Sequence, residues 1–154
     1  SFLRFKFSGR DFYADTYGKW MAGTICDKLG TGFDGICWVP VSKKRRRERG
    51  YDQSELLARV IAKKLSLPLV PALQKHAERG PQSQLKDAAQ RRSNASGAFS
   101  VLPGTDVSGK TLLLIDDIVT TGATLSECCR VLKGAGAARV ACAAFASPRN
   151  ENER

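Results

Sequence analysis

A short apolar run in the last third of the chain is followed by two acids and then by threonines that surround a glycine. This stretch reads TLLLIDDIVTTGATL over residues 111–125. The carboxylates of Asp116 and Asp117 repel each other unless both reach solvent, a cation or hydrogen-bond donors, and neighbouring sugar hydroxyls are such donors. Threonine hydroxyls and free backbone N–H groups beside Gly122, where a helix is expected to begin, attract a phosphate. The stretch therefore suits a ribose 5-phosphate.

Helix capping is the alternative explanation of the same residues, because Asp and Thr side chains commonly accept hydrogen bonds at helix N-termini. Capping accounts for one Thr and one Asp of the stretch, but not for two acids and three threonines together. We therefore favour ligand binding over a purely structural role.

A second glycine-containing motif, GTDVSGKT at residues 104–111, matches the pattern of a nucleotide-binding P-loop. A P-loop opens a helix. Here Lys110 and Thr111 lead directly into the apolar run, which is expected to be a strand. We reject a P-loop on this context.

The elements that position these residues are read from hydrophobic spacing. Helices are predicted over residues 11–29, 54–65 and 122–133, and strands or extended segments over 35–42, 67–73, 97–102, 112–115 and 140–145. The apolar stripe expected on the first helix consists of Phe12, Tyr13, Trp20, Met21, Ile25 and Leu29. Residues 74–96 are polar and can contribute little core, which is typical of a lid, a binding loop or a disordered segment.

The alternation of strands and helices predicts an α/β fold with a central parallel sheet that helices flank on both faces. Residues 112–115 are uniformly apolar, as in a central strand covered on both faces. In such sheets ligands bind at the carboxyl ends of the strands, which is where Asp116 and Asp117 would lie. The 154 residues are long enough for one core, so we expect a single domain over residues 1–154.

Positive charge is concentrated in one place. The net charge is +10, and the stretch KKRRRER at residues 43–49 holds six bases and one acid. Such a run is usually a solvated face, but it also suits a phosphorylated metabolite or nucleic acid. The aromatic content of 8% argues against pure single-stranded DNA binding, which uses aromatic stacking platforms. Tyr51 is the one candidate for stacking, and core packing explains it equally well.

No apolar stretch approaches the length of a membrane span, and no signal segment opens the chain, so we expect a soluble, cytoplasmic protein. The five cysteines lack C-x-x-C spacing, which favours reduced core thiols over metal ligands. They are Cys26, Cys37, Cys128, Cys129 and Cys142.

Several of these stretches together resemble a known family. LLLIDDIVTTGAT resembles the phosphoribosyl-pyrophosphate (PRPP) signature of type I phosphoribosyltransferases. FLRFKFSGR, VPVSKKRRRERGYDQS and PQSQLKDAAQRRSNASGAF are similar to the ComF family, which is linked to competence for DNA uptake. The likeness runs over nearly the whole chain.

The resemblance implies a role for each matching residue. Asp116 and Asp117 would be the catalytic pair, facing the ribose hydroxyls directly or through Mg²⁺. The 5-phosphate would be held by Thr120, Thr121, Gly122, Ala123 and Thr124, and the pyrophosphate by Ser42, Lys43, Lys44 and Arg49 in the loop after Val41. A flexible lid around residues 79–94 would include Gln84, Lys86 and Arg91. The acceptor would bind a hood formed by the N-terminal segment and residues 97–102.

Two departures from the family pattern are visible. ComF proteins commonly carry an N-terminal cysteine-rich zinc segment, and the 154 residues contain none, so we expect no protein-bound metal. The family's Arg-Gly-aromatic-Asn-Gln pattern has Asp52 in place of the Asn.

Two functions fit the sequence. The first is a transferase that moves phosphoribosyl from Mg²⁺–PRPP to an unknown acceptor. Because displacing pyrophosphate builds positive charge on the ribose, catalysis would consist of orienting the reactants, stabilising the leaving group and excluding water. The second is a module without turnover that senses PRPP or a nucleotide or binds single-stranded DNA. A homodimer is possible for either.

Overall fold

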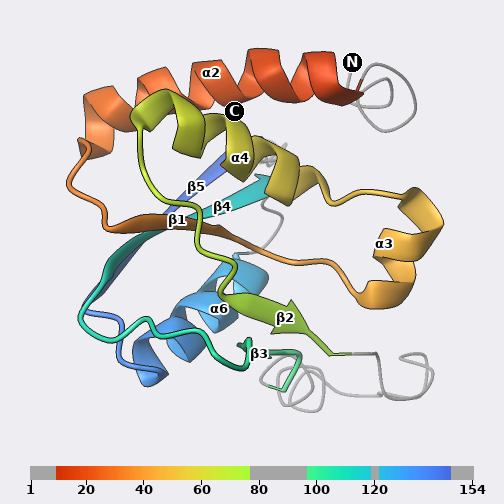
Figure 1. The fold of residues 1–154 in the computed structure, drawn as a ribbon, viewed down its shortest axis with the longest axis vertical. Coiled ribbons are helices and arrows are strands. Elements are labelled where there is room, and N and C mark those ends of the chain that lie inside the picture. The colour runs from red at the N-terminus through yellow and green to blue at the C-terminus, as the bar shows by residue number, and fades with distance from the viewer. Residues whose placement is uncertain (1–9, 77–96, 119–121, 147–154) are drawn as a thin grey trace, which may run out of the picture.

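The computed structural model describes residues 10–76, 97–118 and 122–146. They form three layers, of which a small parallel sheet is the middle one (Figure 1). The helices are α2 (Arg10–Leu29), α3 (Lys43–Arg49), α4 (Gln53–Leu65) and α6 (Ala123–Gly134). The strands are β1 (Gly35–Trp38), β2 (Leu73–Lys75), β3 (Phe99–Val101), β4 (Thr111–Ile118) and β5 (Arg139–Ala146). Within these ranges, no helix is long and apolar enough to cross a membrane.

The main sheet has the strand order β1-β4-β5, and both strand pairs are parallel. β4 is the central strand: Ile115 lies opposite Trp38 on one side and opposite Ala143 on the other. Leu69 extends the sheet beyond β1 through a single parallel bridge to Ile36. The predicted α/β fold with a central parallel sheet is therefore confirmed.

Alternate residues of β4 enter two separate cores. Leu113 and Ile115 pack with α2 and α4 on one face, whereas Leu112 and Leu114 pack with α6 and β3 on the other. All four side chains are completely buried. As predicted, β4 is apolar without interruption because helices cover both of its faces (Figure 1).

The buried stripe of α2 differs from the predicted one. Trp20 is 73% exposed and Leu29 is 43% exposed, so neither belongs to the core. Met21 and Ile25 of the predicted stripe are buried in the core, and Ala22 packs beside them. The side chains of Phe12 and Tyr13 lie outside the described part of the structure. Small residues are favoured on this stripe because α2 crosses α4 closely: a Cβ added at Gly18 would lie 2.5 Å from Cγ1 of Val60.

A second, two-stranded antiparallel sheet lies on the α6 side of the main sheet (Figure 1). β2 pairs with β3 so that Lys75 lies opposite Phe99. β3 falls within the predicted segment 97–102, and β2 begins where the predicted segment 67–73 ends. The N-terminal part of the expected hood, residues 1–9, lies outside the described residues.

The basic run is a helix, not the predicted loop. Ser42 caps the N-terminus of α3 by accepting a hydrogen bond from the Arg45 N–H at 3.2 Å, and Gly50 ends it with a φ of 79°. Like charges one turn apart disfavour such a helix. The ion pair between Arg46 and Glu55, at 3.0 Å, offsets this repulsion by joining α3 to α4.

The P-loop is excluded as predicted. Thr111 begins β4, and the residues before it form turns in which Gly109 has a φ of 71°. Asp106 accepts a hydrogen bond from the N–H of Ser108 at 3.0 Å, which stabilises one of these turns.

The close crossing of α2 and α4 predicts that Gly18→Ala destabilises the fold. The added methyl group overlaps Val60, so we expect the free energy of unfolding to fall by about 1–3 kcal/mol. Gly23→Ala is the matched control on the same helix, because nothing lies within 4 Å of a Cβ there. It should stabilise the protein by up to about 1 kcal/mol through helix propensity. Urea unfolding followed by circular dichroism measures both, and equal effects of the two substitutions would contradict the close crossing.

Candidate functional site

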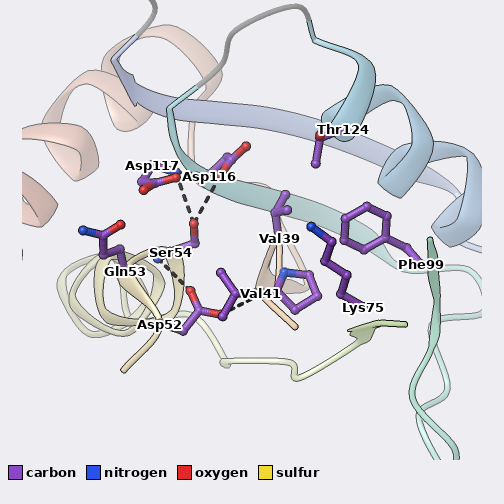
Figure 2. Close-up of a pocket in the computed structure, with 11 residues that line it drawn as sticks. Val39, Val41, Asp52, Gln53, Ser54, Lys75, Phe99, Asp116, Asp117 and Thr124 are labelled. Carbon is purple, nitrogen blue, oxygen red and sulfur yellow. Dashed lines mark hydrogen bonds between the residues drawn. The ribbon is translucent and has the colours of Figure 1, made fainter. Parts of the chain in front are cut away.

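A pocket opens at the carboxyl end of β4 and collects residues from six parts of the chain (Figure 2). It is lined by residues 39–41 after β1, residues 52–54 at the start of α4, Lys75 of β2, Phe99 of β3, Asp116 and Asp117 of β4, and Thr124 of α6. Ligands of parallel α/β sheets bind in this position. The pocket therefore lies where the fold predicts a ligand site.

The acid pair is held by a serine from another element. Ser54 donates its hydroxyl hydrogen to Oδ1 of Asp116 at 3.3 Å and accepts the N–H of Asp117 at 3.2 Å (Figure 2). The same N–H also lies 2.8 Å from Oδ1 of Asp116. Side chains of successive strand residues normally point to opposite faces, yet both acids line the pocket because it wraps around the end of the strand.

Asp116 binds its proton unusually tightly. Burial is the main cause, and the neighbouring Asp117 adds to it, so that the pKa of Asp116 rises from 3.8 to about 7. Hydrogen bonds from the Asp117 amide and from Ser54 act in the opposite direction. A cation or a set of hydrogen-bond donors entering the pocket would favour the ionised form.

The first turn of α4 fixes the wall of the pocket beside these acids. Asp52 caps the helix by accepting hydrogen bonds from the N–H groups of Ser54 at 3.0 Å and Glu55 at 3.2 Å. Its second carboxylate oxygen accepts the N–H of Val41 at 3.3 Å. Asn is an equally good N-cap residue. The Asn of the family pattern could cap the helix in the same way, but its amide has one acceptor oxygen and could not also accept the Val41 N–H as the second oxygen of Asp52 does.

Among the described residues that line the pocket, Lys75 is the one with a cationic side chain. Its ammonium group lies 5.7 Å from the centre of the Phe99 ring, which is buried. The ammonium group and the acid pair face the same space from different elements (Figure 2). The pocket thus combines carboxylates with a cation, which suits a ligand that has both hydroxyl and phosphate groups.

The start of α6 contributes the expected glycine turn. Gly122 is the N-cap residue and has a φ of 79°, a conformation that favours glycine. Thr124 lines the pocket, and Ala123 is the first residue of the helix. Thr120 and Thr121 lie outside the described residues. The structure thus brings the start of α6 and the acid pair to one pocket.

Three of the four residues predicted for pyrophosphate lie at the start of α3, directly after the lining residue Val41. Ser42 caps α3, and Lys43 and Lys44 are exposed in its first turn, so none of the three lines the pocket. Arg49 is the last residue of α3, and its side chain is not described. The predicted lid residues Gln84, Lys86 and Arg91 lie outside the described part of the chain.

Ser54, Lys75 and Gln53 are among the lining residues that were not predicted as site residues. Ser54 and Lys75 have no distinguishing spacing in the sequence, because the hydrogen bond from Ser54 spans 62 residues and β2 has only three residues. Gln53 is buried in the wall, where its Nε2 has no hydrogen-bond partner. Gln53 is the last residue of the stretch that matches the family's Arg-Gly-aromatic-Asn-Gln pattern, and this resemblance could have indicated it.

The donor set fits a hard cation that arrives with its ligand. Asp116 and Asp117 offer carboxylate oxygens, which Mg²⁺ prefers, and Mg²⁺ commonly takes one or two carboxylates together with substrate phosphates. In the described ranges no three His, Cys, Asp or Glu side chains gather as a metal site. The remaining donors would therefore come from the ligand and water.

Comparison with known families identifies the class of the fold. The profile of the phosphoribosyl transferase domain matches residues 52–154, and the chain belongs to this family. Glutamine PRPP amidotransferase from Bacillus subtilis has a TM-score of 0.61 at 23% identity, over 88% of this chain and 26% of that one. Purine phosphoribosyltransferase from Pyrococcus horikoshii has a TM-score of 0.53 at 18% identity, over 88% and 73%. The fold is that of type I phosphoribosyltransferases.

The sequence relatives of this chain support the predicted likeness to the ComF group. It is 28% identical over 138 residues to competence protein F of Haemophilus influenzae, covering 86% of this chain and 60% of the relative. It is 32% identical over 108 residues to the DNA utilization protein YhgH of Escherichia coli O157:H7, covering 70% and 46%. Competence protein ComFC of Bacillus subtilis is 28% identical over 135 residues, covering 88% and 53%. The chain spans about half the length of these relatives.

The raised pKa of Asp116 predicts how stability depends on pH. The unfolded chain ionises this carboxyl near pH 4, whereas the folded protein keeps it protonated up to about pH 7, so folding loses stability as pH rises through this window. Asp116→Asn removes the effect. We expect the variant to match the wild type near pH 4 and to be more stable by roughly 2 kcal/mol at pH 8. Thermal unfolding between these pH values measures the difference.

Asp27→Asn, at an exposed position on α2, is the control for loss of one acid. A constant difference between Asp116→Asn and wild type across this pH range would contradict the buried, protonated state of Asp116.

Proposed function

We propose that the pocket binds PRPP with Mg²⁺ and that the protein transfers the phosphoribosyl group to an acceptor. The observation that carries this proposal is the convergence of Asp116, Asp117, the start of α6 and Lys75 on one pocket at the carboxyl end of β4. The phosphoribosyltransferase fold supports it.

The arrangement suggests how PRPP would lie. The ribose hydroxyls face Asp116 and Asp117, and the 5-phosphate faces the turn at Gly122, where the N-terminal end of α6 favours negative charge. Lys75 then supplies positive charge for the remaining phosphates. Thr120, Thr121 and Ala123 keep their proposed phosphate-binding role. The predicted roles of Ser42, Lys43, Lys44 and Arg49 require α3 to approach the ligand.

The proposed chemistry needs no nucleophile on the protein. As the bond to pyrophosphate lengthens, positive charge develops on the ribose, and the acid pair stabilises that charge through the hydroxyls. Mg²⁺, when bound with the ligand, neutralises the leaving pyrophosphate. Lys75 adds charge to the same end, and a closing segment that includes Gln84, Lys86 and Arg91 would exclude water.

The relatives suggest the process. Because similar proteins are named for competence and DNA utilization, we propose that this chain takes part in the uptake or use of DNA, in the cytoplasm. The acceptor of the phosphoribosyl group stays open. A homodimer also remains a prediction.

Titration calorimetry with PRPP and Mg²⁺ tests the site. Wild type should bind, and the double variant Asp116→Asn/Asp117→Asn should bind roughly tenfold to a hundredfold more weakly, because charge-assisted hydrogen bonds to the ribose are lost. Lys75→Gln should also weaken binding, whereas Lys110→Gln, on a turn outside the pocket, should not. Equal heats from wild type and the double variant would refute the assignment. Release of pyrophosphate in the presence of an acceptor separates transfer from binding alone.

Nucleic-acid binding is a second candidate function, favoured by the structure of α3. Arg46 is paired with Glu55, while Lys43, Lys44, Arg45 and Arg47 are exposed on the same short helix. The ion pair fixes the helix on α4 and leaves four cations toward solvent. Such a cluster is suited to phosphate backbones.

Reversing two of these charges tests this candidate. Arg45→Glu/Arg47→Glu preserves the pair between Arg46 and Glu55, and it should weaken binding of a single-stranded oligonucleotide. The slope of log K against log salt should become shallower by roughly one to two. PRPP affinity should stay within about twofold, because neither arginine lines the pocket. Unchanged DNA affinity would exclude α3 as the contact, and loss of both ligands together would show one shared site.

A further inference from the structure

Two cysteines that lie 13 residues apart in the sequence meet between α6 and β5. The sulfur atoms of Cys129 and Cys142 are 3.2 Å apart. This separation is longer than a disulfide bond and shorter than the usual distance between unbonded sulfur atoms. Both thiols are free, Cys129 is half-buried and Cys142 is exposed. The backbones of the helix and the strand therefore place these two thiols as a pair.

The pair is separate from the ligand pocket. No cysteine is among the residues that line the pocket. Cys37 and Cys128 lie in the core between the main sheet and α6 and are completely buried, and Cys26 is exposed on α2. The expectation of reduced core thiols thus holds for the two buried cysteines but not for Cys26 and Cys142.

We propose that Cys129 and Cys142 form a reversible disulfide that links α6 to the edge strand β5. The oxidant would be a low-molecular-weight disulfide such as oxidised glutathione. One protein thiolate attacks it, forms a mixed disulfide and releases one glutathione. The second protein thiolate displaces the other glutathione from the protein sulfur, and the two protons lost by the protein are taken up by the two glutathione thiolates.

The surroundings set the conditions for this reaction. Although part of the Cys142 side chain is exposed, desolvation by the protein atoms around its thiol and the neighbouring Cys129 raise its pKa to about 12; Asp116 acts in the same direction and Lys133 in the opposite one. The pKa of Cys37 is also raised to about 12, mainly by burial, and burial raises the pKa of Cys128 still further. Because the thiolate is the reacting form, oxidation is slow at neutral pH and accelerates as pH rises. The buried thiols of Cys37 and Cys128 lack the access to compete.

The link would act on the helix that borders the pocket. Gly122 caps α6, Thr124 lies in its first turn, and Cys129 lies further along the same helix. β5 is the edge strand of the main sheet. A bond from Cys129 to Cys142 would fix α6 to that edge while leaving the pocket residues themselves unmodified.

The experiment uses the full chain with Cys26→Ser, which removes the exposed thiol on α2. The protein is incubated with oxidised glutathione at pH 8, unfolded, and its free thiols are counted and mapped by tandem mass spectrometry. We expect the number of free thiols to fall from four to two, a crosslink between Cys129 and Cys142, and full recovery after dithiothreitol. Fragmentation within the peptide is needed because Cys128 and Cys129 are adjacent.

Two single substitutions complete the test. Cys142→Ser should leave Cys129 as a stable glutathione adduct without a crosslink. Cys129→Ser should give no crosslink either, because Cys128 is buried and points into the core. The proposal is overturned if the parent protein retains four free thiols, if Cys129 and Cys142 each keep a glutathione, or if a crosslink to Cys142 persists in Cys129→Ser.

Discussion

The burial of β4 on both faces leaves its carboxyl end as the place where the strand can present polar groups. Leu112 and Leu114 face one core and Leu113 and Ile115 the other, so that no side of the strand is free before Asp116. A carboxylate at the end of such a strand needs hydrogen-bond donors. Ser54 provides one, and the remaining polar groups around the acids belong to the pocket.

The first turn of α4 connects this strand to the rest of the site. Asp52 caps the helix and holds Val41, Ser54 holds the acid pair, and Glu55 holds α3 through Arg46. Asp52, Ser54 and Glu55 are close together in the chain and all buried, and each of them holds a different part of the site. These three polar side chains can be buried because each makes a hydrogen bond or an ion pair with a different backbone or side-chain group.

The general fold and the acid pair could be predicted from the sequence, because an uninterrupted apolar run, helical spacing and a glycine turn are local patterns. The contacts that complete the pocket could not. Ser54 and Asp116 are 62 residues apart, and Lys75 belongs to a strand of three residues, which is too short to show a period. Two local patterns were also misleading. Trp20 has core-like spacing but faces solvent, and the run at 43–49 forms a helix that Ser42 caps and that Arg46 joins to Glu55, a residue outside the run.

The ion pair between Arg46 and Glu55 joins the basic helix to the same turn of α4 whose Ser54 lines the pocket. A shift of that turn when the pocket fills would therefore also reposition the cations of α3. Thermodynamic linkage then requires reciprocity: whatever factor a small ligand applies to the affinity for a polyanion, the polyanion applies to the affinity for the small ligand.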